Sequence, residues 1–248
     1  MSITLSYIIP AYNEEAIIRE SIERFTKDLT NLSDIISSYE IIIVDDRSTD
    51  RTAEIVAHIS TQDQRIRLIQ QKRNGGVGRA ILTGLTAATM DWISVNCVDQ
   101  PFKTSDIRKL APFFQDNDLI IICRKNRSAN HWYRKLTSYG NYALIRFILW
   151  SGVHDFQFAQ FYRREQLAQM NIVTRGTLVP PEMILRCLHQ GARTSEIFLD
   201  FHKRPGGKAK YGHPKYIFIA LIEMCYLRFH FWKERWMSHK HLEVIKKQ

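Results

Sequence analysis

Short apolar runs alternate with segments of helical spacing over the first hundred residues, and this alternation limits the possible folds more than any other feature. The apolar runs span 5–9, 39–44, 67–69 and 92–95, and the helical segments span 14–29, 50–59 and 76–88. Continuous apolar runs are typical of strands in a parallel sheet, because crossover helices bury both of its faces. The pattern therefore predicts an α/β fold with a mostly parallel sheet and helices on both faces.

The pattern is less regular after residue 101. It predicts strands at 119–123, 158–162 and 196–202, and helices at 132–150, 181–190 and 216–236. Neither an internal repeat nor a linker interrupts it. We expect one domain over 1–212, with halves of about 1–101 and 102–212, followed by a C-terminal segment at 213–248.

Composition narrows the class of protein. The chain has 248 residues, of which 45% are hydrophobic and 24% charged, which is enough apolar surface for a large core. Its four cysteines are widely spaced and form no CxxC pair, so we expect neither a disulfide framework nor a zinc site, and a reducing cytoplasm is favoured. The first residues lack a basic region and meet Pro10 early, so no secretion signal is expected.

Positive charge is concentrated near the end of the chain. The net charge is +10, and from Phe201 onward eleven Lys or Arg residues face three Glu. Such asymmetry favours an anionic partner, which could be a membrane surface, a phosphate-bearing substrate or nucleic acid. An ordinary solvated basic face is the alternative. No nucleic-acid-binding motif accompanies the charge, so no nucleic-acid partner is expected.

Acidic and glycine-rich loops follow the predicted strands. Asp45 and Asp46 close the run at 39–44, and Asp99 follows the run at 92–95. Ligands of parallel sheets bind beyond the carboxyl ends of the strands, where such acids bind ribose hydroxyls, base edges or a divalent cation. The alternative is that they cap helices and turns. The glycine-rich turn at 74–78 matches neither a dinucleotide fingerprint nor a P-loop.

Three segments together carry a family resemblance. Residues 10–15 read Pro-Ala-Tyr-Asn-Glu-Glu, residues 44–50 read Val-Asp-Asp-Arg-Ser-Thr-Asp, and residues 74–80 read Asn-Gly-Gly-Val-Gly-Arg-Ala. In this order and spacing they resemble family 2 glycosyltransferases, which have the GT-A fold. The resemblance implies that the first half binds a UDP- or GDP-sugar. The donor-binding residues it implies are Pro10, Tyr12, Glu14, Asp45, Asp46, Asn74, Gly76, Arg79, Asn96, Asp99 and Gln100.

The same resemblance implies a metal cofactor, Mg²⁺ or Mn²⁺, on the donor diphosphate. The family holds this ion with a DxD-type motif, which commonly reads Asp-Ala-Asp-Asp-Gln. Residues 95–101 depart from it and read Val-Asn-Cys-Val-Asp-Gln-Pro. Asp99 is therefore the expected metal ligand, with Gln100 as a further oxygen ligand and Asn96 as a weaker one.

The second half is similar to the branch that acts on polyprenol phosphates and lipid-linked glycans. Arg124 ends a predicted strand where that branch often has an arginine. Residues 151–164 are similar to a stretch in which that branch has a Gly, a few residues later an Asp, and then an aromatic-Arg run, although Phe158-Ala159-Gln160 stands where Ser-Gly-Phe is usual. Arg204 and Lys210 match an element expected near donor or acceptor phosphates.

The resemblance implies an inverting, in-line transfer in which a nucleoside diphosphate leaves. Charge on the diphosphate would be neutralised by a metal on Asp99 together with Arg204 and Lys210. Asp155 is the candidate catalytic base, with Glu182 in reserve, for a hydroxyl acceptor; a phosphate acceptor needs no base. A helix cap or salt-bridge partner is the alternative for Asp155, and a first-turn helix acid is the alternative for Glu182.

The C-terminal segment predicts a membrane-surface helix. Its apolar run at 216–227 has only twelve residues and contains Glu223, so it is too short to span a bilayer. Aromatic residues beside a basic tail are typical of a helix in an anionic interface, and packing against the domain or a partner subunit is the alternative. We therefore expect sugar transfer to a polyprenyl-phosphate or lipid-linked glycan acceptor at the inner membrane face. The alternative function is a nucleotide-sugar-binding or regulatory subunit with impaired catalysis.

Overall fold

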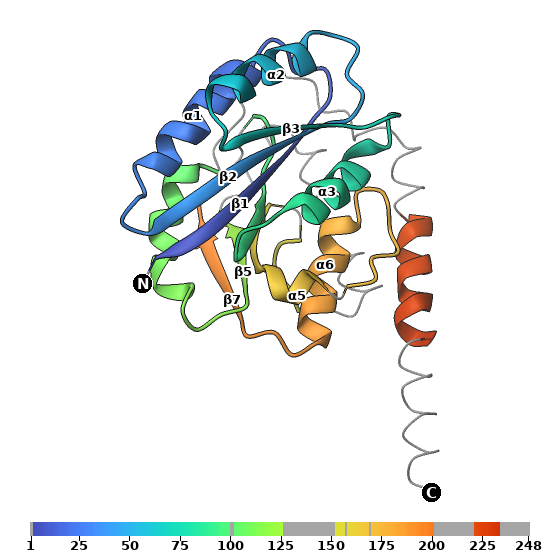
Figure 1. Ribbon diagram of the computed structural model, residues 1–248. Helices are drawn as coiled ribbons and strands as arrows, with labels where there is room; N and C mark the ends of the chain where they lie inside the picture. Colours follow the sequence, from blue (N-terminus) through green and yellow to red (C-terminus); the bar gives the residue numbers. More distant parts are fainter. Residues whose placement is uncertain are drawn as a thin grey trace, which may run out of the picture. The chain divides into compact units, whose positions relative to one another are not determined.

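The computed structural model describes residues 2–99, 102–125, 152–156, 158–168, 170–200 and 221–233 (Figure 1). By its internal contacts the chain forms two compact units. The first combines Met1–Ser128 with His154–Gly207, and the second combines Ala129–Val153 with Lys208–Gln248. The expected helix at 132–150 lies outside the described residues.

A seven-stranded sheet forms the centre of the first unit, with strand order β3-β2-β1-β4-β6-β5-β7. The strands are β1 (Ile3–Ala11), β2 (Ile36–Asp45), β3 (Ile66–Gln70), β4 (Trp92–Val95), β5 (Leu119–Arg124), β6 (Ala159–Arg163) and β7 (Thr194–Leu199). The helices are α1 (Ile18–Thr30), α2 (Thr52–Gln62), α3 (Gly76–Ala87), α5 (Arg164–Ala168), α6 (Val179–His189) and the 3-10 helix η1 (Thr104–Phe113).

Strand direction places several loops at one edge of this sheet. β1 pairs in parallel with β2 and β4, β2 with β3, and β5 with β7. β6 runs antiparallel to both β4 and β5. The carboxyl ends of β1, β2, β4 and β5 therefore lie at the same edge, together with the first residues of β6. The expected mostly parallel α/β sheet is confirmed.

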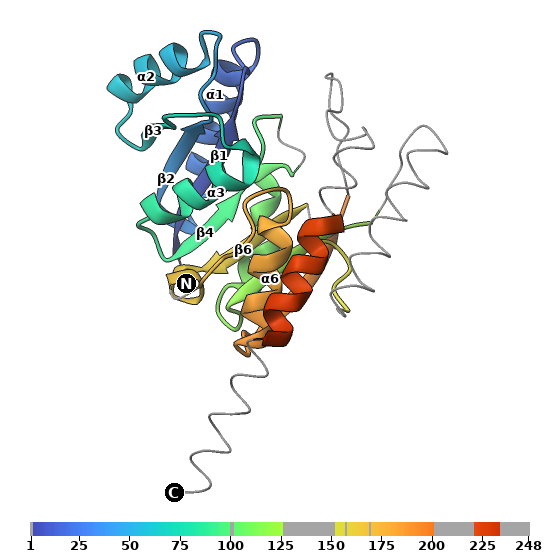
Figure 2. The same cartoon turned by 90° about the vertical axis from the view of Figure 1, so that its right-hand side faces the viewer.

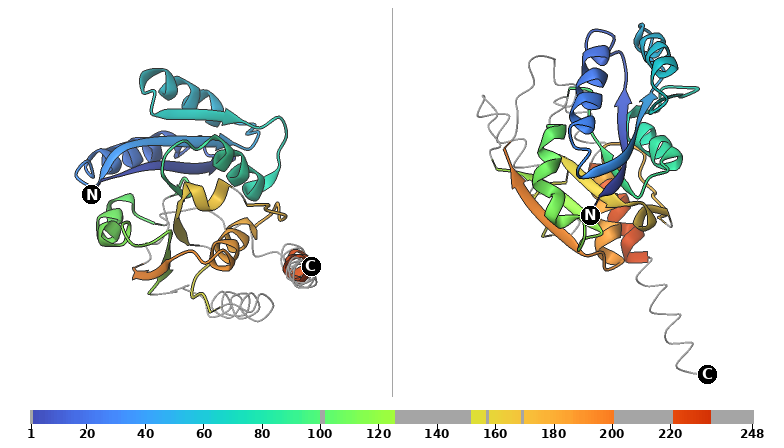
Figure 3. Two further views of the ribbon diagram at one scale, coloured as in Figure 1. Left: turned by 60° about the horizontal axis from the view of Figure 1, so that its bottom comes forward. Right: turned by 60° about the vertical axis from the view of Figure 1, so that its left-hand side comes forward.

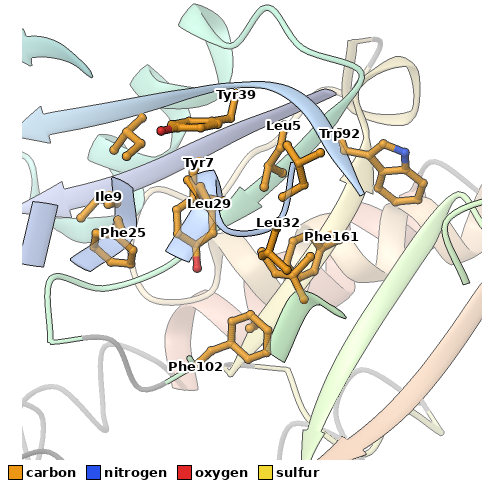
Figure 4. Packing of buried hydrophobic residues seen from close by; sticks show 14 of the residues in the cluster. Leu5, Tyr7, Ile9, Phe25, Leu29, Leu32, Tyr39, Trp92, Phe102 and Phe161 are labelled. Atoms are coloured by element: carbon orange, nitrogen blue, oxygen red, sulfur yellow. The ribbon is translucent and has the colours of Figure 1, made fainter. Parts of the chain in front are cut away.

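Helices cover both faces of the sheet (Figure 3). Leu5, Tyr7 and Ile9 of β1 belong to the larger core cluster, which includes one face of α1 and part of η1. Figure 4 shows this packing, in which the rings of Tyr7 and Phe25 meet edge to face with centroids 5.3 Å apart. Ile8 points the other way, into a smaller cluster with Ala80 of α3. Successive side chains of β1 thus point to opposite faces of the sheet and contribute to the apolar cluster on each face.

Observed element bounds differ from the expected ones mainly at α1. The expected helix begins at 14, whereas α1 begins at Ile18. The difference arises because residues before Ile18 form a turn whose backbone bonds to the loop after β2 and to the start of α2: the Glu15 N–H donates to Asp50 Oδ2 at 3.1 Å, and the Glu14 N–H donates to Thr52 Oγ1 at 2.8 Å. The turn keeps Glu14 at the carboxyl edge of the sheet.

A buried carboxylate ties β2 to its neighbours on the α3 side. Glu40 is 5% exposed and accepts hydrogen bonds from Ser6 Oγ at 2.7 Å and from Thr89 N at 2.7 Å, and it pairs with Arg67. Burial alone would raise the pKa of Glu40, but the hydrogen bonds from Ser6, Thr89 and Arg67 outweigh it and lower the pKa below its ordinary value.

Glu40 therefore predicts a pH-dependent part of the stability. Because its pKa is lower in the folded state, its contribution is fully present above the unfolded pKa, about 4.3, and is lost as pH falls through the folded pKa. We expect Glu40→Gln to lower the free energy of unfolding by about 3 kcal/mol at pH 7. The difference from wild type should shrink in urea titrations below about pH 4, and a difference that is constant with pH would contradict this account.

The described part of the second unit contains a helix over 221–233. Met224 and Leu227 are buried, whereas four large apolar side chains are exposed: Ile222, Tyr226, Phe229 and Trp232. Among the described residues, none of the helices combines the length and apolar character needed to cross a membrane.

Candidate functional site

Hydrogen bonds join the loop after β1 to the loop after β2. Asn13 adopts a positive φ of 54°, and its Oδ1 accepts a bond from Thr49 N at 2.8 Å. The Asn13 N–H in turn donates to Ser48 Oγ at 3.0 Å. Asparagine tolerates this left-handed conformation better than most residues. Tyr12, which is 37% exposed, is thereby held at the carboxyl edge of the sheet next to the end of β2.

Two buried acids end β2 and organise the loops around them. The two carboxylate oxygens of Asp45 lie 3.2 and 3.3 Å from Ser48 N. In Asp46, Oδ1 accepts from Gly75 N at 2.7 Å and Oδ2 from Gly76 N at 2.8 Å. Each acid is less than 5% exposed. Asp46 thus links β2 to the glycine-rich turn, and it does so by binding N–H groups at the start of a helix, as the capping alternative predicts.

The glycine-rich turn at the start of α3 has specific backbone requirements. Gly76 has a φ of +79°, a conformation that side chains rarely adopt. A Cβ on Gly78 would lie 2.1 Å from Gly176 O, so only glycine allows this contact. A Cβ on Gly75 would lie 2.4 Å from Arg79 Cδ, so the arginine stem runs over the turn. Asn74 Nδ2 completes the turn by donating to Asp46 O at 3.1 Å.

Asn96 braces the loop after β4. Its Nδ2 donates to Tyr7 O–H at 2.7 Å and to Phe102 O at 2.9 Å, while its Oδ1 accepts from Cys97 N at 2.9 Å. Desolvation by burial raises the pKa of Tyr7, so its phenol stays protonated. Because both ends of the amide are engaged, Asn96 shapes the loop in this geometry and its oxygen does not face outward as a ligand.

The residues present fit a cation that is held mainly by a bound diphosphate. The described parts of the chain contain no group of three or more His, Cys, Asp or Glu side chains placed for a metal. In the loop after β4, Asp99 supplies one carboxylate, and Gln100 lies outside the described residues. Mg²⁺ commonly takes one or two carboxylates and completes its shell with substrate phosphates and water. Asp99 with a diphosphate meets that requirement, whereas Asp99 alone does not.

A buried ion pair marks the end of β5. Arg124 donates from Nε and Nη2 to the two oxygens of Asp155, at 2.7 and 3.0 Å. The Asp155 side chain is 2% exposed and that of Arg124 is 25% exposed. Bidentate pairs of this kind are strong and fix both partners. The arrangement is the salt-bridge alternative for Asp155, and a base at this position would have to give up bonds to Arg124.

Aromatic side chains connect this ion pair to the loop after β4. The Arg124 guanidinium lies 5.7 Å from the ring centroid of Phe158, and Phe158 meets Phe102 edge to face at 6.1 Å. Phe102 in turn accepts the hydrogen bond from Asn96 through its carbonyl oxygen. The two halves of the candidate site are therefore in continuous packing contact along the carboxyl edge.

Residues 6–170 match the sequence profile of a known family, described as glycosyl transferase family 2. This span is more than half of the chain. The chain belongs to glycosyl transferase family 2. The resemblance of the loops at 10–15, 44–50 and 74–80 to that family is thus confirmed.

Relatives of this family 2 chain include an undecaprenyl-phosphate 4-deoxy-4-formamido-L-arabinose transferase from Proteus mirabilis. It is 27% identical over 225 residues, which cover 90% of this chain and 65% of that protein. The chain thus spans less than two thirds of that relative.

Solved structures with the same fold include glucosyl-3-phosphoglycerate synthase from Mycobacterium tuberculosis. One contains Mn²⁺, UDP-glucose and phosphoglyceric acid, with a TM-score of 0.64 and 18% identity. Another contains UDP, with a TM-score of 0.62 and 19% identity. Each covers 90% of this chain and 80% of the solved chain. At this identity the likeness confirms the GT-A fold.

Glu182 of the family 2 chain lies in a closed hydrogen-bond network. It is fully buried at the first turn of α6, and its oxygens accept bonds from Val173 N at 2.9 Å, Thr174 N at 2.8 Å and Thr174 Oγ1 at 2.7 Å. Arg186 Nε adds a fourth bond at 2.7 Å. Four bonds saturate the carboxylate, so the structure places Glu182 as a loop anchor, in line with the helix-acid alternative.

A second carboxylate anchors the segment before Asp155, a role that the sequence did not assign to it. Glu196 of β7 accepts bonds from His154 N at 2.7 Å and from His154 Nδ1 at 2.6 Å. The His-Asp dipeptide is thus held from two neighbouring strands. The position of Glu196 inside a short strand was the sequence feature that could have indicated a structural role for this carboxylate. Arg204 and Lys210, the expected phosphate-binding residues, lie outside the described residues.

Proposed function

We propose that this chain transfers a sugar from a UDP- or GDP-sugar to a polyprenyl-phosphate or lipid-linked glycan acceptor, in cell-envelope polysaccharide or glycolipid synthesis. The observation that carries the proposal is the convergence of three loops at the carboxyl edge of the sheet: Asp46 donates its N–H to Ala11 O at the end of β1 and accepts bonds from Gly75 N and Gly76 N of the glycine-rich turn. The relative from Proteus mirabilis acts on undecaprenyl phosphate according to its name, which supports the acceptor class.

In this proposal the acceptor oxygen attacks the anomeric carbon while the bond to the diphosphate breaks and its electron pair leaves with the diphosphate. The loops around Asp45 and Asp46 hold the nucleoside, and the glycine-rich turn, fixed by Asp46, lines the same edge of the sheet. Arg124, fixed by Asp155, presents positive charge in the second half of the domain, about 102–212, where we place the acceptor. A divalent cation bound with Asp99 would neutralise charge on the leaving diphosphate.

For a phosphate acceptor the chain needs no catalytic base, because the phosphate already carries a nucleophilic oxygen. This fits the geometry of Asp155, whose oxygens are engaged by Arg124. We therefore assign Asp155 a positioning role and Glu182 an anchoring role. A hydroxyl acceptor would require a base other than these two in the geometry described.

Purified protein screened by thermal shift against UDP- and GDP-sugars tests the proposal. A ligand that binds only the folded state raises the melting temperature. We expect one nucleotide class to raise it, and that donor to be turned over when undecaprenyl phosphate is supplied. No shift with any nucleotide-sugar would remove the proposal.

The second candidate is a nucleotide-sugar-binding subunit with impaired catalysis. The observation that favours it is the loop after β4, in which Asn96 is committed to bracing and Asp99 is the carboxylate that remains. This candidate predicts nucleotide binding without release of nucleoside diphosphate. Release of nucleoside diphosphate by the wild type that is lost in Asp99→Ala would exclude this candidate.

The metal should bind together with the nucleotide. With a single carboxylate in the loop after β4, we expect Mn²⁺ alone to leave the melting temperature unchanged, and Mn²⁺ with UDP or GDP to raise it above the value with nucleotide alone. Isothermal titration of Mn²⁺ with and without the nucleotide measures the same dependence. Tight Mn²⁺ binding in the absence of nucleotide would contradict a diphosphate-held cation.

We further propose that the helix over 221–233 lies on the anionic inner face of the cell membrane. Its exposed stripe contains Ile222, Tyr226, Phe229 and Trp232, spaced as one face of a helix. Aromatic residues partition into the interface, and the excess of Lys and Arg from Phe201 onward complements anionic headgroups.

Sedimentation with phosphatidylglycerol vesicles tests this surface. The double variant Tyr226→Glu with Trp232→Glu should lose most of its pelleting, because both acids oppose insertion and lipid charge. Phe198→Ser is the matched control, since it removes an exposed aromatic side chain from β7 in the first unit. Equal pelleting of all three proteins would show that the helix does not bind the membrane.

A further inference from the structure

A loop far along the sequence contacts the glycine-rich turn. Residues 172–178 are the last part of the connection from α5 to α6, and α6 lies next to α3 (Figure 2). The carbonyl oxygens of Arg175 and Gly176 would lie 2.4 and 2.1 Å from a Cβ on Gly78. Backbone therefore packs directly on backbone at the first turn of α3. The loop forms a wall beside the candidate donor site, although neither motif resemblance nor spacing assigns it there.

Glu182 sets the conformation of this loop. Its carboxylate binds the backbone N–H groups of Val173 and Thr174 as well as the Thr174 hydroxyl. These are the residues immediately before the two carbonyls that contact Gly78. The anchor is buried and fully hydrogen-bonded, so it leaves the loop little freedom. Glu182 thus acts on the glycine-rich turn through one short piece of backbone.

Arg175 brings positive charge to this wall. Its side chain is exposed, and its Nη1 donates to the carbonyl oxygens of Ile172 at 2.8 Å and Thr174 at 3.3 Å. Arg175 pairs with no carboxylate among the described residues, and its Nε and Nη2 donors make no hydrogen bond to them. Arg79, whose side-chain stem crosses Gly75, likewise forms no ion pair with a carboxylate of the described residues. The two backbone segments that meet at Gly78 therefore each carry an arginine without an acidic partner in the described chain.

We propose that Arg175 binds the diphosphate of the nucleotide-sugar, and that Glu182 is the residue that positions it. The inference rests on the proposed function, because it names a further ligand of the same donor. An arginine guanidinium offers several donors in a fixed plane and matches phosphate oxygens in pairs. The loop at 172–178 and the turn at 74–79 then face the diphosphate from two directions.

Affinity for a nucleotide compared with its nucleoside tests Arg175. UDP, uridine, GDP and guanosine are titrated calorimetrically into the full chain with Mn²⁺ present. Whichever base the wild type binds, Arg175→Gln should weaken binding of the diphosphate about tenfold or more and leave nucleoside binding unchanged. Arg24→Gln, which removes an exposed arginine of α1, is the control and should change neither.

Glu182→Gln tests the positioning step against a matched buried acid. Glu40 likewise accepts bonds from a backbone N–H, hydroxyl groups and an arginine, but it lies in the interior of β2 away from the carboxyl edge. Both variants should lower the melting temperature. At a temperature where both remain folded, only Glu182→Gln should weaken UDP or GDP binding, and Arg175→Gln should add little to it in the double variant.

The outcomes separate the two proposals. A wild-type chain that binds neither UDP nor GDP would overturn the proposed function and this inference with it. Wild-type binding that is unchanged in Arg175→Gln would overturn the inference while the proposed function stands. Equal nucleotide affinity in Glu182→Gln and Glu40→Gln would show that Glu182 has only a structural role.

Discussion

Replacing Asp46 with alanine is expected to weaken UDP or GDP binding about a hundredfold. The variant removes two charge-assisted hydrogen bonds to Gly75 and Gly76, together about 3 kcal/mol of the energy that holds the glycine-rich turn in its binding conformation. The ligand would then have to order the turn, and the free energy of this ordering would be subtracted from the binding free energy. Calorimetric titration of wild type and variant, each with Mn²⁺, measures the loss.

Asp63→Ala is the matched control for Asp46. Asp63 also shapes a turn, accepting from Arg65 N at 3.0 Å, but that turn precedes β3 at the amino edge of the sheet. The pKa of Asp63 is lowered by its hydrogen bonds to Arg65, so its loss should cost some stability at neutral pH. Nucleotide affinity should stay at the wild-type value. If both variants lose affinity equally, the turn at Asp46 is not part of the donor site.

The second large effect is expected at Gly78. Its Cα lies against the carbonyl oxygens of Arg175 and Gly176, and a Cβ would come within 2.1 Å of the nearer oxygen. Backbone cannot yield as a flexible side chain would, so Gly78→Ala must push α3 and the loop at 172–178 apart. We expect a loss of about 3 kcal/mol in the free energy of unfolding and a fall of about 6–12 °C in melting temperature.

Gly152→Ala is the control for this substitution. A Cβ there would have no neighbour within 4 Å, and the backbone does not require glycine. The change should leave the melting temperature within a degree or so of wild type or raise it slightly. A Gly78→Ala variant as stable as Gly152→Ala would contradict the close contact between α3 and the loop.

The local pattern of apolar residues is sufficient to predict most strands and helices in the first half of the fold. β1 to β4 and the helices between them follow from continuous apolar runs and helical spacing, since these strands are parallel and buried on both faces. The loops at their carboxyl ends follow from the same pattern. The sequence alone therefore predicts that Asp46 and the turn at 74–78 lie at the same edge of the sheet.

Other features depend on contacts that sequence spacing does not encode. The apolar run of β6 is the same whether the strand runs parallel or antiparallel, so its reversal between β4 and β5 was not predicted. Asn96 reads as a possible ligand, yet its partners Tyr7 and Phe102 are brought to it by the fold. Asp155 and Glu182 are likewise predicted as catalytic candidates from the sequence. Their partners Arg124 and Thr174 cannot be identified from sequence spacing.

Hydrogen–deuterium exchange of the full chain with and without saturating UDP and GDP, in the presence of Mn²⁺, tests the central claim most directly. Bound nucleotide should slow amide exchange in the loops at 12–15, 46–49 and 74–79, and in the loop at 172–178, while β7 and α2 stay unchanged. Protection confined to other parts of the chain, or none at saturating concentrations of both nucleotides, would contradict a donor site at the carboxyl edge of this sheet.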